Sequence, residues 1–149
     1  MTFAFLLPAC SRRDPWQLQQ IRTGNSAFNT SKLTWINPDR VNGLDLEMIS
    51  SEEGLRMALV AHSDPIAPYA LDEKKALVKI SSAQKERVLL ASRREGGQRI
   101  LLPEETYPFI LYALQEGQSV TFRVPGYRTT VQSKNFSTHL KKIRYIREN

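Results

Sequence analysis

Apolar and polar residues alternate in short runs along most of the chain, and this two-residue period is typical of half-buried β-strands. Turn-forming residues separate the runs, as at Asn37-Pro38-Asp39 and Pro125-Gly126. Because few residues join consecutive runs, the pattern favours antiparallel pairing, and residues 44–61 are expected to form one β-hairpin. The expected strands cover residues 31–36, 44–49, 55–61, 76–81, 87–92, 99–102, 120–124 and 128–132.

At one place within this strand-rich region, the spacing of apolar residues changes from that of a strand to that of a helix. Pro103-Glu104-Glu105 supplies proline and acidic residues, which suit the first turn of a helix. Pro108 would fall in the first turns, so the helix is expected to start nearer Tyr107. Gly117 is a suitable C-terminal stop. The sequence therefore predicts one helix inserted between the later strands.

A second helix is predicted at the end of the chain. Phe136, Leu140 and Ile143 stand at i, i+4 and i+7, which is the core-facing stripe of a short amphipathic helix. Ser133 can cap its start. The predicted fold class is mainly β, a β-sandwich or open barrel with antiparallel strands, one inserted helix and a C-terminal helix.

The 149 residues fit one domain that buries a core without disulfides. We interpret residues 1–10 as a signal or lipobox remnant and residues 11–30 as a polar tether. Residues 31–149 are then a single β-rich globular domain. One helical turn is expected near Trp16–Ile21. Trp16 itself should dock against the domain, because a tryptophan is too large and apolar to be left in water.

The positive charge of the chain is concentrated at its C-terminal end. The net charge is +6, with 21 basic and 15 acidic residues. From Ser119 onward there are seven basic residues and one acid, Glu148, so this stretch alone carries +6 and the first 118 residues are neutral. A basic end favours an anionic partner, although a solvated terminal helix explains the same pattern. The candidate residues for anionic-partner binding are Arg123, Arg128, Lys134, Lys141, Lys142, Arg144 and Arg147.

The segment Leu7-Pro8-Ala9-Cys10 resembles the lipobox of bacterial lipoproteins, in which an apolar segment and a small residue precede an acylated cysteine. Leu7 and Ala9 match the family pattern, and Pro8 departs from it. A signal peptide also begins with positive charge, and the nine residues before Cys10 carry none. Two alternatives stay open: a start upstream of Met1, or a Cys10 that lies in an apolar terminus or first strand.

The lipobox resemblance implies a location. Cys10 would be the lipidation site, and the polar residues after it would hold the domain off the membrane. By the same resemblance, Ser11 after the acylated cysteine implies an outer-membrane lipid anchor in the bacterial cell envelope. Two acyl chains would anchor the protein firmly, whereas one chain binds only marginally.

A fainter resemblance covers residues 98–143. The order of strand, helix ending in Gly117, strand pair and terminal helix from Phe136 is similar to the end of invasion-associated locus B-type secreted β-sandwich proteins. The paired cysteines common in that family are missing here. The resemblance implies an envelope location and no particular activity.

The inventory of reactive side chains supports no catalytic or metal site. One cysteine and two histidines, His62 and His139, offer no paired ligand spacing, so neither a metal nor a cofactor is expected. A Cys10 nucleophile would need one of these histidines as its base, and neither sits in a recognisable motif. The acid pairs Glu52-Glu53 and Glu104-Glu105 are explained by a turn and a helix start. We name no catalytic residue and do not expect an enzyme.

The leading hypothesis is a non-catalytic accessory or binding lipoprotein that contacts the membrane through its anchor and an envelope protein or anionic lipid through its basic surface. The alternative is a soluble, cytoplasmic nucleic-acid-binding or regulatory protein that uses the same surface. Nucleic acid is the less favoured partner because no RRM, KH or zinc-finger signature is present. An enzyme with a scattered site comes third.

Overall fold

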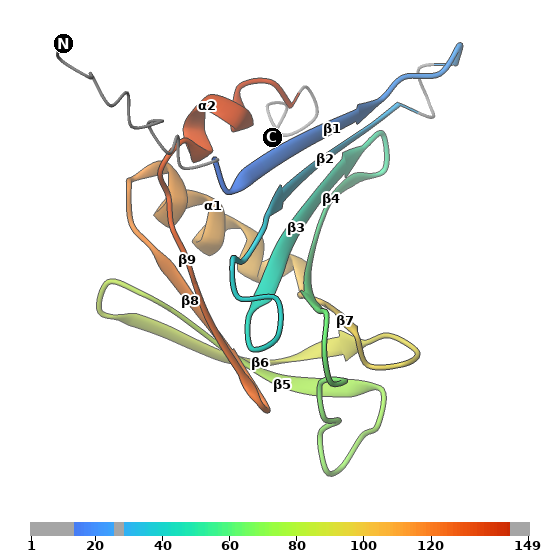
Figure 1. Cartoon of the computed structure of the whole chain (residues 1–149), viewed down its shortest axis with the longest axis vertical. Coiled ribbons are helices and arrows are strands. Elements are labelled where there is room, and N and C mark those ends of the chain that lie inside the picture. The colour runs from blue at the N-terminus through green and yellow to red at the C-terminus, as the bar shows by residue number, and fades with distance from the viewer. Residues whose placement is uncertain (1–13, 26–28, 144–149) are drawn as a thin grey trace, which may run out of the picture.

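The computed structural model describes residues 14–25 and 29–143 (Figure 1). Within these residues nine strands form one antiparallel sheet in the order β1-β2-β3-β4-β7-β6-β5-β8-β9. The predicted fold class, mainly antiparallel β with an inserted and a C-terminal helix, is confirmed. The strands are β1 (Trp16–Ile21), β2 (Thr30–Trp35), β3 (Leu44–Ser51), β4 (Gly54–Ala61), β5 (Lys75–Ser82), β6 (Lys85–Arg93), β7 (Arg99–Leu101), β8 (Val120–Val124) and β9 (Tyr127–Val131), and the helices are the 3₁₀ turn η2 (Glu104–Thr106), α1 (Tyr107–Gln115) and α2 (Phe136–Leu140).

The sheet is curved so that its far end approaches its beginning, and α1 lies between the two halves (Figure 1). Strand β9 reaches β3 without pairing to it. The hydroxyl of Thr129 on β9 accepts hydrogen bonds from the Leu44 N–H (2.8 Å) and from the Asn37 side-chain amide (3.2 Å). Side-chain contacts therefore join the two ends, and the sheet is an open barrel whose inner face forms the core.

Local turn chemistry explains why the strands and α1 end where they do. Gly126 (φ 84°) turns the chain between β8 and β9. Gly117 follows α1 with φ 78°, and the next residue, Gln118, donates its N–H to Ala113 O at 2.9 Å. This is the Schellman arrangement, in which a left-handed residue lets the chain satisfy the last helical carbonyls. The predicted glycine stop is confirmed.

The interpretation of residues 11–30 as a tether is wrong for Trp16–Ile21, which form strand β1 and no helical turn. Trp16 is 2% exposed and its ring lies 5.1 Å from that of Phe136. Its indole N–H donates to Gln132 O at 3.3 Å. The strand was missed because it is an edge strand: its glutamines face solvent, so little apolar alternation remains to be read. Trp16 docks, as predicted.

The start of α2 also differs from the prediction. Asn135 precedes the helix in the left-handed region (φ 68°), and no side chain caps it. Ser133 contributes its backbone carbonyl, which accepts the Phe136 N–H at 2.9 Å. The predicted stripe of Phe136, Leu140 and Ile143 is buried, with Ile143 just beyond the helix.

We expect Trp16→Ala to lower the free energy of unfolding by about 3–5 kcal/mol, because the ring is buried against α2 and a cavity would replace it. Urea unfolding followed by far-UV circular dichroism measures this change. The neighbouring exposed residue supplies the control: Gln17→Ala should stay within about 0.5 kcal/mol of wild type. A Trp16→Ala variant as stable as this control would mean that β1 is not part of the folded core.

Candidate functional site

The structure divides the predicted basic surface into two groups. Arg123 and Arg128 lie beside the turn that joins β8 to β9. Lys134, Lys141 and Lys142 are exposed around α2, which lies at the opposite end of β9 (Figure 1). Arg144, Arg147 and Cys10 lie outside the described residues. The single basic C-terminal surface expected from the sequence is therefore not formed by the five residues that can be placed.

Arg123 and Arg128 instead gain a third cation from earlier in the chain. Lys79 on β5 is paired in register with Arg123 on β8, which is paired in register with Arg128 on β9. Residues directly opposite each other in a sheet point to the same face, and neighbouring strands are about 4.8 Å apart. Three cations thus stand in a row about 10 Å long on the outer face.

Charge compensation along this row is incomplete. Lys79 forms an ion pair with Glu86 (3.3 Å). Neither Arg123 nor Arg128 has an ion-pair partner within residues 14–25 and 29–143. Like charges directly opposite each other destabilise a sheet by up to about 1 kcal/mol. Repulsion between Arg123 and Arg128 therefore lowers the stability of the sheet, and an anion bound across the two guanidinium groups would offset that loss.

Apolar side chains continue the same face beyond the cations. Val88 on β6 is opposite Lys79, and Leu77 is opposite Leu90 one row away. Their exposed fractions are 60% for Val88, 43% for Leu77 and 39% for Leu90, which is high for large aliphatic residues. We call the surface formed by these residues the outer patch: Leu77, Lys79, Val88, Leu90, Arg123 and Arg128.

Elsewhere on the outer face two acids of β3 are buried, although alternation along this strand would place its polar side chains in water. Asp45 is 5% and Glu47 6% exposed. Asp45 accepts hydrogen bonds from Arg40 (2.9 Å) and from the Asn37 N–H (2.9 Å), and its other oxygen lies 2.7 Å from His62 Nε2. This network ties the loop after β2 and the end of β4 to β3.

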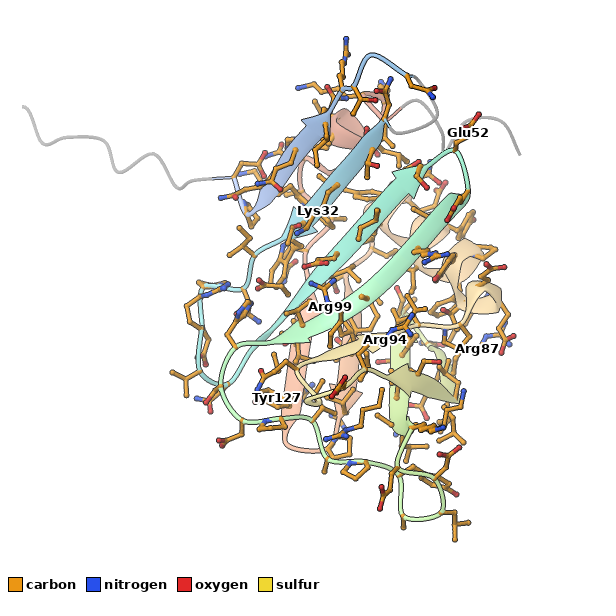
Figure 2. The ribbon with its side chains drawn as sticks, turned by 90° about the vertical axis from the view of Figure 1, so that its right-hand side faces the viewer. Lys32, Glu52, Arg87, Arg94, Arg99 and Tyr127 are labelled. Carbon is orange, nitrogen blue, oxygen red and sulfur yellow. The ribbon has the colours of Figure 1, made fainter. Side chains whose placement is uncertain are left out.

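Glu47 is bound by cations from both sides. Arg99 on β7 contacts it through both terminal nitrogens, and Lys32 on β2 lies 3.5 Å from it. Figure 2 shows Lys32 and Arg99 on either side of β3. A buried carboxylate needs such partners, since an unpaired buried charge is costly. The carboxylates of Asp45 and Glu47 hold strands together, and their arrangement is sufficiently explained by that role.

Two adjoining hollows follow the line where the sheet fails to close. One, of about 430 Å³, lies between the loop after β2 and strand β9, and its wall includes Trp35, Asp39 and Arg128. The other, of about 290 Å³, lies beside the β8–β9 turn, and Asn42 lines both. The buried indole N–H of Trp35 has no acceptor among the described residues.

A third hollow, of about 460 Å³, lies beside β4, β6, β7 and η2. Arg56, Lys75 and Arg94 line it together with Glu104 and Glu105. Its charges are mixed, so it has no strong preference for an anion or a cation. The acid pair singled out in the sequence opens η2, as predicted from helix-start chemistry.

Two tyrosines have structural roles. Burial raises the pKa of Tyr107, whose hydroxyl donates to Leu102 O (2.9 Å) and accepts the Met57 N–H (3.0 Å). Burial, with the charge of Asp64, raises the pKa of Tyr127, whose hydroxyl donates to Asp64 O. Both hydroxyls stay protonated and bridge segments that are distant in sequence.

Neither a metal centre nor a membrane-spanning helix is found in the part of the chain that the structure describes. No three His, Cys, Asp or Glu side chains there converge on a point that could hold an ion. No helix there has the length and apolar character needed to cross a bilayer.

Comparison with known proteins gives no relative: no family model, no curated protein and no solved structure matches this chain. The fold and the outer patch therefore carry the functional argument without help from homology.

His139 joins α2 to the start of β1 through Asp14, with 2.6 Å between His139 Nε2 and the carboxylate. Burial acts to raise the pKa of Asp14, but hydrogen bonds from His139 and from the Trp16 N–H outweigh it, so this pKa lies below its ordinary value. Nothing in the sequence pattern indicates this partner for His139.

Since the pKa of Asp14 is lowered on folding, its stabilising effect is present above the unfolded value of about 4 and is lost as the pH falls through the folded value. We expect Asp14→Asn to be less stable than wild type by under about 1 kcal/mol above pH 4, because the carboxylate is 35% exposed. The difference should shrink at lower pH in urea unfolding experiments. A difference that is independent of pH would show that the charge of Asp14 does not contribute.

Proposed function

We propose that this chain is a non-catalytic accessory domain of the bacterial cell envelope, anchored through an acylated Cys10, and that its outer patch rests on an anionic phospholipid surface. The observation that carries the proposal is the in-register row of Lys79, Arg123 and Arg128, two of which have no ion-pair partner among the described residues.

The composition of the outer patch supports a lipid surface as its partner. Peripheral attachment combines apolar side chains that enter the headgroup region with cations that meet anionic headgroups. Leu77, Val88 and Leu90 are exposed beside the cations on one sheet face, so both kinds of contact can form together. Each cation near such a surface contributes about 1 kcal/mol.

Such a contact is weak by itself, and the anchor makes it sufficient. Arg123 and Arg128, the two cations without an ion-pair partner among the described residues, contribute about 2 kcal/mol, which alone corresponds to a dissociation constant of tens of millimolar. A domain already tethered to the same bilayer meets the surface at high effective concentration, so a weak contact can fix its orientation. The lipobox-like residues Leu7-Pro8-Ala9-Cys10 support this anchor.

Acylation is tested by feeding a labelled fatty acid to a bacterial host that expresses the chain from its native upstream region. We expect label on wild type and none on Cys10→Ser, because that sulfur is the proposed attachment atom. Unlabelled wild-type protein in the soluble fraction would contradict the anchor and favour the cytoplasmic, nucleic-acid-binding alternative.

The outer patch is tested separately with the full chain carrying Cys10→Ser, so that no acyl chain contributes. Co-sedimentation with phosphatidylcholine vesicles, with and without phosphatidylglycerol, measures binding. We expect binding only to the anionic vesicles. Arg123→Ser with Arg128→Ser should reduce this binding to the level seen on phosphatidylcholine vesicles, because the two unpaired cations are lost.

Lys141→Ser with Lys142→Ser is the matched control, since it removes the same charge from the exposed α2 end. This variant should bind almost as wild type. Equal weakening by both pairs would mean that net charge and not the outer patch governs binding. Salt-sensitive binding to a short DNA duplex in place of vesicles would favour the nucleic-acid alternative.

A further inference from the structure

The two ends of the sheet are protected to different degrees. On the β9 side, Thr129 receives hydrogen bonds from Leu44 and Asn37, and the carbonyl of Gln132 accepts the indole N–H of Trp16. The loop after β2 therefore contacts β9 through the Thr129 side chain. Among the described residues, strand β1 is the first strand of the sheet and pairs only with β2.

Backbone parity identifies which groups of β1 face its free edge. The Ile36 N–H donates to Pro15 O at 2.9 Å, so the backbone groups of residue 15 point toward β2. Successive residues of a strand point their N–H and C=O groups to alternate sides. Residues 17, 19 and 21 thus pair with β2, and residues 16, 18 and 20 present their backbone groups to the free edge. One of these groups, the Trp16 N–H, is held by Asp14 (3.0 Å).

The sequence of β1 lacks the features that usually keep strand edges apart. Natural edge strands carry lysine or other charges, proline or bulges that discourage pairing with another chain. The six residues of β1, WQLQQI, contain no charged residue and no proline, and their register with β2 is uninterrupted. This edge is suited to accept a further strand.

We propose that a second copy of this chain supplies that strand, through antiparallel pairing of β1 with β1 about a two-fold axis at Leu18. Such an interface is self-complementary and closes after two copies, because both copies use the same β1 edge. The two sheets then continue into one another through backbone hydrogen bonds from Leu18 and Gln20.

Charge complementarity selects the register. Side chains that are opposite each other in a sheet point to the same face. In a two-fold pair, one residue therefore lies opposite its own copy, and even-numbered residues of one chain pair only with even-numbered residues of the other. Centring on Leu18 places Asp14 of one copy opposite Arg22 of the other, twice. The same register brings the two Leu18 side chains together.

The neighbouring registers lack this charge pairing. Centring on Gln17 places Asp14 opposite Gln20, and centring on Gln19 places Asp14 opposite Gly24. In neither case does Asp14 meet a cation of the other copy. The register centred on Leu18 is therefore the favoured one.

The pairing of β1 with β1 does not depend on the proposed function, since it uses the free edge of β1, whereas the outer patch lies on the face of β5, β6, β8 and β9. It is tested with the full chain carrying Cys10→Ser, by sedimentation velocity over a range of concentrations. We expect a reversible dimer and no larger species.

Two double variants test the contact with a matched control. Gln17 and Gln19 are exposed, and the Leu18-centred register places Gln17 of one copy opposite Gln19 of the other. Gln17→Glu with Gln19→Glu puts like charges opposite each other twice and should weaken the dimer about tenfold. Gln17→Lys with Gln19→Glu keeps the same change at position 19 but makes both pairs attractive, so the dimer should be restored.

Cysteine crosslinking tests the register directly. In a Cys10→Ser chain, Gln17→Cys with Gln19→Cys should form an interchain disulfide under mild oxidation, because these positions form a close, non-hydrogen-bonded pair. Gln17→Cys alone should not form a disulfide, since this register places position 17 of one copy opposite position 19, and not position 17, of the other. Monomers at all concentrations, or equal crosslinking of the single and double variants, would overturn the proposal.

Discussion

A single antiparallel sheet must bury one of its faces, and here it does so by curving until its last strand, β9, meets β3 and the loop before it. The Thr129 hydroxyl on β9 is one point of contact, because it accepts hydrogen bonds from Leu44 at the start of β3 and from Asn37 in the preceding loop. The position of α1 between the two halves follows from the same curvature (Figure 1).

Strand order gives the outer face two different electrostatic environments. Over β2, β3 and β7, the carboxylates of Asp45 and Glu47 are surrounded by cations and stabilise the strand order. Over β5, β8 and β9, Arg123 and Arg128 stand opposite each other, and neither forms an ion pair with another described residue. The charges of the first group are neutralised within the protein, whereas those of the second group can bind an anion from outside it. That contrast is why the outer patch, and not the buried acids, is the candidate for function.

Much of the fold could be predicted because short-range patterns specify it. Alternation gave the strands from β2 to β9, and glycine at Gly117 gave the end of α1 through its left-handed backbone. Strand β1 could not be predicted, since an edge strand with exposed glutamines shows no clear alternation of apolar and polar residues. The prediction that Ser133 caps α2 was wrong, because Asn135 precedes the helix in a left-handed conformation and no side chain caps it.

The candidate site was predictable only in part. Arg123 and Arg128 were recognised as basic residues of one terminal stretch, but Lys79 was not, because its register with Arg123 is a pairing between distant strands. The amino-acid sequence by itself determined strands β2 to β9, the turns, the two helices and the excess of positive charge, since these depend on neighbours along the chain. Only the tertiary structure decided which charges stand together, which acids are buried and which edge is left free, because strand order and curvature bring distant residues into contact.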